Sequence, residues 1–407
     1  MKILHLSSSD TGGAGSAGLR LHKAMLSMNL FSSFLCLKKT SELNSVIEYP
    51  KFYPRFYHRF LTSLGFPCTH TEKNYKRINE LTRVIEPEMY SFPDSDYKIH
   101  EHQLFKEADV IIIHWVAGFL DYKSFFTNIP EKKKVFWYTH DFSSILGGFH
   151  TLFDDEQFGD EGIQIGEEKL KLEKQKYISN CRHLNFIGNS KFTYKILLES
   201  GIVDKKFVHC VPLGIPRKEL NRIEKALAKK VLGLDGKKFI IMMASASLAA
   251  KRKGLERLYS IFDAEKDLKD LTQVVTIGSE QPNALSIKIN IKHFGSVWNP
   301  VFKSIIFSAA DVVVSTSYEE TFGQTIIEGY ACGTPAIVFN NSALPELIVE
   351  GKTGYVANTI EDFTKNLLEL SRDNETLSAM GTAAYQLFKD KYTSEHQVNV
   401  LLKLLTI

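Results

Sequence analysis

Long apolar runs are absent from this chain, and cysteine is scarce. The apolar stretch at the N-terminus, Met1–Leu6, is too short and too broken for a signal peptide, and no run approaches membrane-spanning length. The cysteines are odd in number, scattered and without C-x-x-C spacing: Cys36, Cys68, Cys181, Cys210 and Cys332. We therefore expect a cytoplasmic protein with reduced thiols, and neither a membrane-spanning protein nor a disulfide framework or zinc site.

A strong charge of one sign and internal repeats are absent as well. Lys and Arg together number 50 and Asp and Glu 47, so the formal net charge is only +3, which gives no general case for nucleic-acid binding. No repeat or low-complexity tract interrupts the 407 residues. With 44% hydrophobic and 24% charged residues, the composition is that of a soluble globular protein, and the length allows two or three domains.

The chain does have a regular alternation of short apolar strands and helical stretches, which is typical of a parallel α/β sheet. In the first half we predict strands at Lys2–Ser8, Ser33–Leu37, Asp109–His114, Lys134–Thr139, Asn185–Gly188 and Phe207–Pro212. In the second half we predict strands at Phe239–Ala244, Thr272–Ile277, Lys288–Phe294, Asp311–Thr316 and Ala336–Phe339. Two such sets predict two doubly wound, Rossmann-like domains.

The boundary between these domains is predicted at Val211–Pro216. This segment holds two prolines and a glycine, and a charged helical stretch, Arg217–Lys230, follows it. We therefore place an N-terminal domain in residues 1–212 and a C-terminal domain in residues 213–392.

The most informative stretch, Ser315–Pro335, follows the apolar run Ala310–Val314, which predicts a buried strand. A helix is predicted next, with apolar residues at Phe322, Ile326, Ile327 and Tyr330. Unpaired N–H groups at a helix start attract an anion, and Glu320 and Glu328 bracket this turn. The two carboxylates can hold the hydroxyl-rich and phosphate-bearing parts of one ligand; the alternative is a plain βαβ unit with two exposed glutamates.

The pair Glu320 and Glu328 resembles the E-x7-E motif of retaining glycosyltransferases with the GT-B architecture, most closely glycosyltransferase family 4. The same pattern continues through Gly333–Val338, Pro345–Ile348 and Gly351–Val356. The resemblance implies the GT-B fold, in which two Rossmann-like doubly wound domains face a central cleft. It also implies that the last helix, residues 393–407, packs back on the first domain.

For the second domain, the resemblance implies how a nucleotide-sugar donor is held. Glu328 would hold the ribose hydroxyls, while Glu320 and nearby amides would hold the donor sugar and the β-phosphate. The donor-binding residues at the helix start are Phe322, Gly323, Gln324 and Thr325. The segment Lys292–Val297 corresponds to the family's nucleobase pocket, through Phe294 and Val297.

A loop with three cations, Lys251, Arg252 and Lys253, follows the predicted strand Phe239–Ala244. Cations suit a diphosphate leaving group, whose charge grows as the glycosidic bond breaks; the alternative is a solvated charge run. Lys253 matches the lysine of the family's K-G motif, but Ser247 stands where many members have an arginine. The usual pair is therefore incomplete, and Arg252 or Lys251 is the candidate substitute.

In the first domain, the candidate ligand-binding residues follow two predicted strands. The glycine-rich loop at Gly12 and Gly13 lets the backbone approach a diphosphate or sugar, and it resembles the family's donor-facing loop. His140 lies just past a strand, where open α/β sheets bind ligands, and the family carries a similar His-Asp pair there. His114 and Trp115 are weaker candidates on the acceptor side; a histidine with a purely structural role is the alternative.

The acidic segment Asp154–Glu161 is predicted to be a mobile loop, because no strand positions its carboxylates. We expect no metal in the site. Outside the family pattern, Lys51–Phe66 mixes aromatic and basic residues, which suits peripheral contact with the inner face of an anionic membrane. A packed helix with outward arginines is the alternative.

We predict a retaining, metal-independent glycosyltransferase in bacterial polysaccharide or lipid-linked glycan synthesis, with His140, Lys253 and Glu320 as catalytic residues. It would use a UDP- or GDP-linked sugar as substrate, with no separate cofactor, and a glycan or lipid-linked acceptor. By analogy with the family, the diphosphate takes up the acceptor proton. Two alternatives stay open: a sugar-nucleotide epimerase or hydrolase on the same fold, and a non-catalytic nucleotide-sugar-binding protein, for which Ser247 is the hint.

Overall fold

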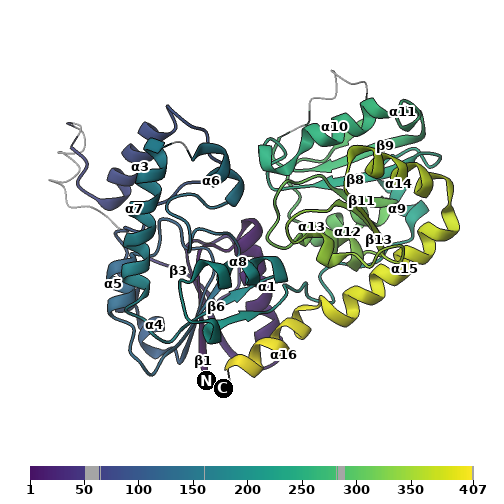
Figure 1. Cartoon of the computed structure of the whole chain (residues 1–407). Helices are drawn as coiled ribbons and strands as arrows, with labels where there is room; N and C mark the ends of the chain where they lie inside the picture. The colour runs from purple at the N-terminus through teal and green to yellow at the C-terminus, as the bar shows by residue number, and fades with distance from the viewer. Residues whose placement is uncertain (51–63, 65, 160, 281, 283–288, 406–407) are drawn as a thin grey trace. The chain divides into compact units, whose positions relative to one another are not determined.

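The computed structural model describes residues 1–50, 64, 66–159, 161–280, 282 and 289–405. The chain forms two compact units (Figure 1): unit 1 consists of Met1–Val211 with Val400–Ile407, and unit 2 of Pro212–Asn399. The segment Lys51–Phe66, for which the sequence suggests a membrane contact, lies almost entirely outside the described residues.

Unit 1 is built on a parallel sheet in the order β3-β2-β1-β4-β5-β6-β7. Its strands are β1 (Lys2–Ser9), β2 (Phe31–Lys38), β3 (Val46–Glu48), β4 (Val110–Ile113), β5 (Lys134–Thr139), β6 (Leu184–Gly188) and β7 (Val208–Cys210). The chain order reverses between β1 and β4, and in such sheets ligands bind outside the carboxyl ends of the strands at this point.

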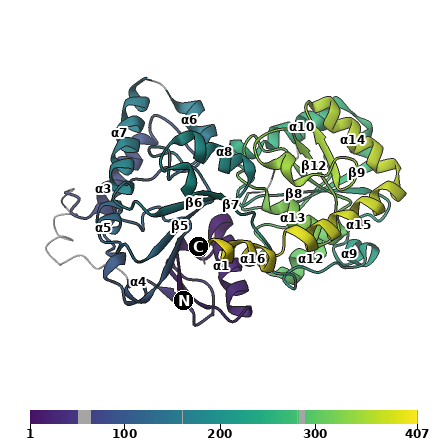
Figure 2. The same cartoon turned by 60° about the horizontal axis from the view of Figure 1, so that its bottom comes forward.

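Helices cover both faces of the unit 1 sheet, with α5 and α7 packed together and α1 on the opposite side (Figures 1 and 2). They are α1 (Gly12–Ser27), α3 (His70–Leu81), α4 (Gln103–Glu107), α5 (Tyr122–Thr127), α6 (Leu152–Phe158), α7 (Glu161–Ile178) and α8 (Lys191–Ser200). Helix α8 shows why these bounds hold. Ser190 and Thr193 form a capping box at its start, and Gly201, in the left-handed conformation, ends it.

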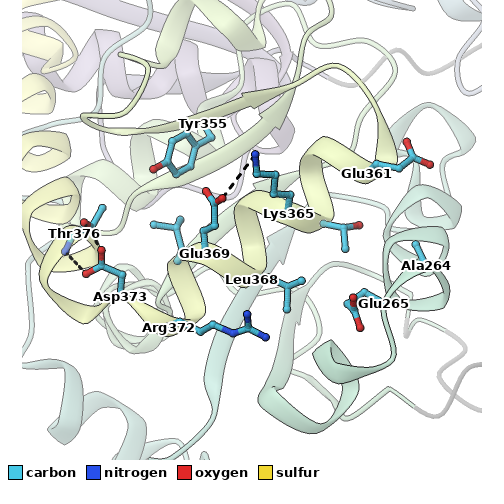
Figure 3. Close-up of a pocket in the computed structure, with 12 residues that line it drawn as sticks. Ala264, Glu265, Tyr355, Glu361, Lys365, Leu368, Glu369, Arg372, Asp373 and Thr376 are labelled. Atoms are coloured by element: carbon cyan, nitrogen blue, oxygen red, sulfur yellow. Dashed lines mark hydrogen bonds and ion pairs between the residues drawn. The ribbon is translucent and has the colours of Figure 1, made fainter.

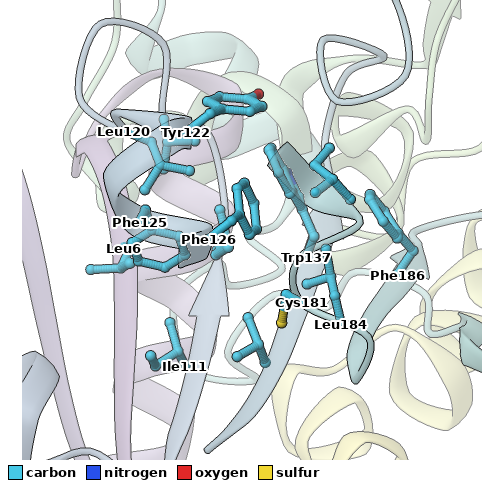
Figure 4. Close-up of a cluster of buried hydrophobic side chains, with 14 of the residues drawn as sticks. Leu6, Ile111, Leu120, Tyr122, Phe125, Phe126, Trp137, Cys181, Leu184 and Phe186 are labelled. Atoms are coloured by element: carbon cyan, nitrogen blue, oxygen red, sulfur yellow. The ribbon is translucent and has the colours of Figure 1, made fainter. Parts of the chain in front are cut away.

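The core of unit 1 is unusually aromatic between the sheet and α5. The Trp137 ring stacks on Phe186 at 5.7 Å and on Phe126 at 6.0 Å between ring centroids. Figure 4 shows these rings with the aliphatic side chains of neighbouring strands around them. Burial of such large apolar surfaces fixes the strands that carry the candidate site residues.

Unit 2 repeats the architecture with a parallel sheet in the order β10-β9-β8-β11-β12-β13. Its strands are β8 (Phe239–Ala244), β9 (Thr272–Ile277), β10 (Ile291–His293), β11 (Val312–Ser315), β12 (Ala336–Phe339) and β13 (Gly354–Ala357). Figure 2 shows α10 and α14 on one side of this sheet and α9 and α12 on the other.

The helices of unit 2 are α9 (Lys225–Val231), α10 (Leu255–Ala264), α11 (Asp267–Leu271), α12 (Pro300–Ala309), α13 (Gln324–Ala331), α14 (Ile360–Arg372) and α15 (Asn374–Lys391). The last helix, α16 (Ser394–Leu405), begins in unit 2 and ends in unit 1, where the Lys134 ammonium donates to the Leu405 carbonyl at 2.9 Å. Within the described part of the chain, no helix combines the length and the apolarity that a membrane span requires.

Each predicted strand is present, and the prediction of two Rossmann-like α/β domains is confirmed. Two short edge strands, β3 and β13, were not predicted. The prediction of a mobile loop over Asp154–Glu161 was wrong. Most of that segment belongs to α6, where Thr151 caps the helix and the buried Asp154 accepts a hydrogen bond from the Glu88 amide at 3.0 Å.

Candidate functional site

The turn between β11 and α13 in unit 2 carries the first glutamate of the E-x7-E motif. The helix begins at Gln324, with Gly323 as its N-cap at a φ of 100°, in the left-handed region that favours glycine. The expectation that Phe322 lies in the helix was wrong. Phe322 precedes the cap, and its buried ring packs edge-on against Tyr392, with 6.1 Å between the ring centroids.

Glu320 is the centre of a polar cluster in this turn. One carboxylate oxygen, Oε1, pairs with the Lys253 ammonium at 2.6 Å and accepts from the Ser317 hydroxyl at 3.1 Å. The Glu320 amide donates to the Ser342 hydroxyl at 2.9 Å, which fixes the backbone. Burial alone would raise the pKa of Glu320, but the charges of Lys253 and Arg252 outweigh it and lower that pKa.

The cationic loop is tied to the same turn through its backbone. The Arg252 guanidinium donates to the Glu319 carbonyl at 2.7 Å, and the Tyr318 amide donates to the Arg252 carbonyl at 2.8 Å. Gly254 then turns the chain at a φ of 64°, and any Cβ there would collide with the carbonyl oxygen of Thr316. The glycine after Lys253 is therefore required for the loop to reach the turn.

Glu328, the second glutamate of the motif, is buried on α13 and forms an ion pair with Lys303 of α12 at 3.1 Å. Lys303 was missed in the sequence, because nothing near it in the chain marks it. Only the packing of α12 beside α13 brings the two together.

Ser247 lies in the loop after β8, close to an acid that sequence reasoning also missed. The Glu280 carboxylate accepts from the Leu248 amide at 3.0 Å. Hydrogen bonds from the Ser279 and Ser247 side chains lower the pKa of Glu280. Position 247 thus supplies a hydroxyl to a carboxylate, whereas an arginine there would supply a cation.

The remaining donor-binding candidates of unit 2 surround the same end of its sheet. Phe294 follows β10, where its amide donates to the Thr276 carbonyl at 3.0 Å and its ring meets Phe302 edge-on at 5.7 Å. Val297 lies in the loop that leads to α12, and Gln324 and Thr325 form the first turn of α13.

In unit 1, Gly12 and Gly13 open α1 directly after β1. Gly12 has a φ of 76°, and a Cβ at Gly15 would collide with the carbonyl oxygen of Ser9. Asp10 fixes the loop from the other side, because its carboxylate accepts from the amide of Ser41 at 2.7 Å. The loop lies at the carboxyl end of β1, and the approach of its backbone to a diphosphate or sugar stays a prediction.

His140 lies just past β5 and is the last member of a row of histidines. Its Nε2 lies 2.9 Å from Nδ1 of His114, whose Nε2 lies 2.9 Å from Nδ1 of His5. Burial lowers the pKa of His140 to about 4, so the ring is neutral at pH 7. His114 is thus a buried partner of His140 in the core of unit 1.

Asp141 belongs to a second polar group in unit 1. His150 Nδ1 lies 2.5 Å from the Asp141 carboxylate and 3.2 Å from Trp115 Nε1, and His150 Nε2 lies 2.8 Å from the Ser91 hydroxyl. Burial would raise the pKa of Asp141, but His150 lowers it overall. Trp115, an acceptor-side candidate, contacts this group through His150.

Helix α7 holds the glycine pair that follows His140 and Asp141. The buried Glu167 carboxylate accepts from the Gly148 amide at 2.7 Å, and the buried Lys174 ammonium donates to the carbonyls of Ser143 and Gly147. A Cβ at Gly147 would collide with Glu167. Burial lowers the pKa of Lys174 to about 8, and Glu167 opposes that shift.

A cavity of about 740 Å³ in unit 2 lies apart from the candidate residues. Its lining comes mostly from α10, α14 and Tyr355 of β13, and two of its charged side chains, Lys365 and Glu369, form an ion pair at 3.9 Å (Figure 3). None of the motif residues lines it.

Residues 224–387 match the family model described as Glycosyl transferases group 1. An alpha-1,3/1,6-mannosyltransferase of Dictyostelium discoideum is 25% identical over 177 residues, which are 43% of this chain and 41% of that protein. A D-inositol 3-phosphate glycosyltransferase of an Arthrobacter species is 29% identical over 174 residues, 42% of this chain and 39% of that protein. The chain thus spans about two fifths of the length of either relative.

A similar fold occurs in HepE of Anabaena, whose crystal structure contains UDP and glucose. The TM-score is 0.63 at 13% sequence identity, and the alignment covers 100% of this chain and 99% of that one. The chain therefore shares with HepE a fold of two Rossmann-like domains, of the GT-B type.

Proposed function

We propose that the chain, whose residues 224–387 form a glycosyl transferases group 1 domain, is a retaining glycosyltransferase that moves a sugar from a nucleotide-sugar to an acceptor hydroxyl. The observation that carries the proposal is the cluster at the start of α13, where Glu320 meets Lys253 at 2.6 Å and Arg252 contacts the adjacent carbonyl. Two cations, a carboxylate and the amides of a helix start form a site for a diphosphate and a sugar hydroxyl.

During the reaction, the bond between the sugar C1 and the diphosphate oxygen breaks, and negative charge grows on the diphosphate. Lys253 and the amides of Gly323 and Gln324 would stabilise that charge, and Arg252 would replace the arginine for which Ser247 stands. The acceptor hydroxyl attacks C1 from the same face and gives its proton to the departing diphosphate. The protein supplies no nucleophile in this scheme, and no metal is required.

Glu328 would bind the ribose of the donor nucleotide. A carboxylate accepts hydrogen bonds from two neighbouring hydroxyls, and the ion pair with the Lys303 ammonium at 3.1 Å holds this carboxylate in position. Glu320 would accept from a hydroxyl of the transferred sugar, while His140 of unit 1 would donate to another sugar hydroxyl or to phosphate. Gly12 and Gly13 would give the donor room at the unit 1 sheet.

The donor is proposed to be a UDP- or GDP-linked sugar, and the acceptor a glycan or a lipid-linked saccharide. HepE, which shares the fold, binds UDP and glucose, and one relative is a mannosyltransferase. A membrane-proximal acceptor would also give a role to Lys51–Phe66.

The test has two stages. First, thermal unfolding is measured with UDP- and GDP-sugars, since a ligand that binds the native state raises the melting temperature. Second, the stabilising donor is incubated with saccharide acceptors, and the anomeric configuration of the product is read by NMR. Transfer with retained configuration supports the proposal. Donor turnover that no acceptor changes identifies a hydrolase or epimerase, and binding without turnover identifies a non-catalytic binding protein.

A further inference from the structure

Three imidazoles form one hydrogen-bonded row across the sheet of unit 1. His5 comes from β1, His114 follows β4 and His140 follows β5, so the row crosses three adjacent strands. Both N···N separations are 2.9 Å. The rings of His5 and His114 are 5.2 Å apart and inclined by only 8°, and Phe34 of β2 stacks on His5 at 6.0 Å.

The row is packed too tightly to reorganise easily. A Cβ at Gly18 of α1 would lie 3.0 Å from the His114 ring, and Tyr138 stacks against both His114 and His140. His5 is fully buried and His114 is 3% exposed. The two buried rings therefore have one available hydrogen-bonding geometry, and only the positions of their hydrogens are free to vary.

Those hydrogens must all point in the same direction. A neutral imidazole has one N–H and one lone pair, so each N···N contact needs a donor on one ring and an acceptor on the next. Either every ring carries its hydrogen on Nδ1, or every ring carries it on Nε2. Burial lowers the pKa of all three histidines, which keeps the rings neutral at pH 7.

The buried end of the row decides between these two arrangements. Among the residues that the structure describes, none offers His5 Nε2 a hydrogen-bond partner. With hydrogen on Nε2 throughout, this end would be a buried N–H without an acceptor, which proteins avoid more strictly than an unused acceptor lone pair. The arrangement with hydrogen on Nδ1 throughout is therefore favoured.

We propose that His5 and His114 are positioning residues that hold His140 as the tautomer with hydrogen on Nδ1. His114 Nδ1 donates to His140 Nε2, so the other nitrogen of His140 becomes an N–H donor at the carboxyl end of β5. This role rests on the proposed function at one point, namely that the Nδ1–H group of His140 donates a hydrogen bond to a sugar hydroxyl or a phosphate oxygen of the substrate. The tautomer itself does not depend on that function.

The direct test is nitrogen NMR on the full chain with ¹⁵N-labelled histidine at neutral pH. The long-range couplings between the ring nitrogens and the hydrogens on the ring carbons distinguish Nδ1–H from Nε2–H in each histidine. Variants at positions 114 and 140 assign the signals to His114 and His140. The neutral histidine side chain in water prefers the Nε2–H form, so the expected Nδ1–H form at His114 and His140 is not the default. An Nε2–H form at His140 overturns the proposal.

Two substitutions of His114 separate positioning from packing. His114→Phe keeps a stacked ring but removes the donor, and it is expected to shift His140 toward the Nε2–H form. His114→Asn places an amide N–H near the former Nδ1 and is expected to retain the Nδ1–H form. His22→Asn is the control, because His22 is buried beside His5 but hydrogen-bonds to Ser32 and Ser45 outside the row. An unchanged His140 tautomer in His114→Phe contradicts the proposal.

If the variant His114→Phe does not fold, the wild-type spectrum and His114→Asn still decide the question. For transfer, His114→Phe is expected to lower kcat/KM about two- to tenfold, the range for loss of one hydrogen bond, while His114→Asn stays closer to wild type. Absence of transfer in the wild-type chain refutes the proposed function and leaves the tautomer assignment to NMR. Normal transfer by His114→Phe with an altered tautomer overturns the positioning role.

Discussion

The two units share one architecture but build their candidate sites from different chemistry. Unit 2 gathers full charges at the carboxyl end of its sheet, where Glu320 pairs with Lys253 and Glu328 with Lys303. Unit 1 places neutral imidazoles and backbone at the corresponding edge, with His140 at the end of a buried row. Paired charges suit a diphosphate, whereas neutral donors suit a sugar hydroxyl, so under the proposed function the two units would contribute different contacts to a nucleotide-sugar.

The largest effect is expected for a substitution in the charged cluster of unit 2. Lys253→Ala should lower kcat about 10²- to 10³-fold with a much smaller change in donor affinity, because the leaving-group charge is greatest in the transition state. Steady-state transfer kinetics and calorimetric donor titration give the two quantities.

Lys251→Ala is the matched control for that experiment, since Lys251 lies in the same turn but is exposed. The kcat of Arg252→Ala should lie between the kcat values of Lys253→Ala and Lys251→Ala if Arg252 replaces the missing arginine. An unchanged kcat in Lys253→Ala would remove the lysine from the chemistry and weaken the distinction between the units.

The second effect concerns binding alone. Glu328→Ala should weaken donor-nucleotide binding by roughly 1.5–3 kcal/mol, the loss of hydrogen bonds to a charged acceptor. Lys303→Ala should cost less, because it leaves the carboxylate in place. Calorimetry with the free nucleotide measures both. Wild-type affinity in Glu328→Ala would rule out the ribose assignment.

The strands whose bounds the sequence predicts to the residue are almost fully buried, because continuous apolar runs mark them. β5 and β9 have the predicted bounds, Lys134–Thr139 and Thr272–Ile277. The missed strands lack that mark. β3 has three residues of which one is buried, and β13 begins with Gly354 directly after a turn.

The same limit applies to the site. Glu320 and Glu328 could be found because seven residues separate them, and Lys253 because a required glycine follows it. Lys303, Glu280 and Ser342 reach the site only through tertiary packing. The role of His5 could not be predicted from the sequence for a further reason. A single histidine in an apolar strand resembles a core residue until its neighbours across the sheet are known.

The third effect tests whether the cationic loop depends on its glycine. Gly254→Ala should destabilise unit 2 by about 1–3 kcal/mol, since the left-handed φ and the Thr316 carbonyl both oppose a side chain. Urea unfolding gives the free energy. Gly236→Ala, where a Cβ meets nothing within 4 Å, should change it little. Equal stability of both variants would mean that the loop can move away from the turn.

The smallest effect distinguishes the units by their response to acid. His22 and His140 have pKa values lowered to about 4 from 6.5. Between these values the unfolded chain binds more protons than the folded one, so unit 1 loses stability as the pH falls below 6.5. At pH near 5.5 the loss should be on the order of 1 kcal/mol per histidine. Glu320, whose pKa lies below 4.5, should weaken unit 2 only at more acidic pH.

Tryptophan fluorescence can follow unit 1 selectively. Trp115 and Trp137 belong to unit 1, and Trp298 of unit 2 is 69% exposed, so Trp298→Phe removes the competing signal with little structural cost. In this variant, the urea concentration at the unfolding midpoint should be lower at about pH 5.5 than at about pH 7. The reason is that protonation of the neutral histidines favours the unfolded state. A midpoint that is equal at both pH values would mean that the imidazoles of unit 1 can be protonated in the folded state. The contrast between the neutral imidazoles of unit 1 and the paired charges of unit 2 would then be lost at acidic pH.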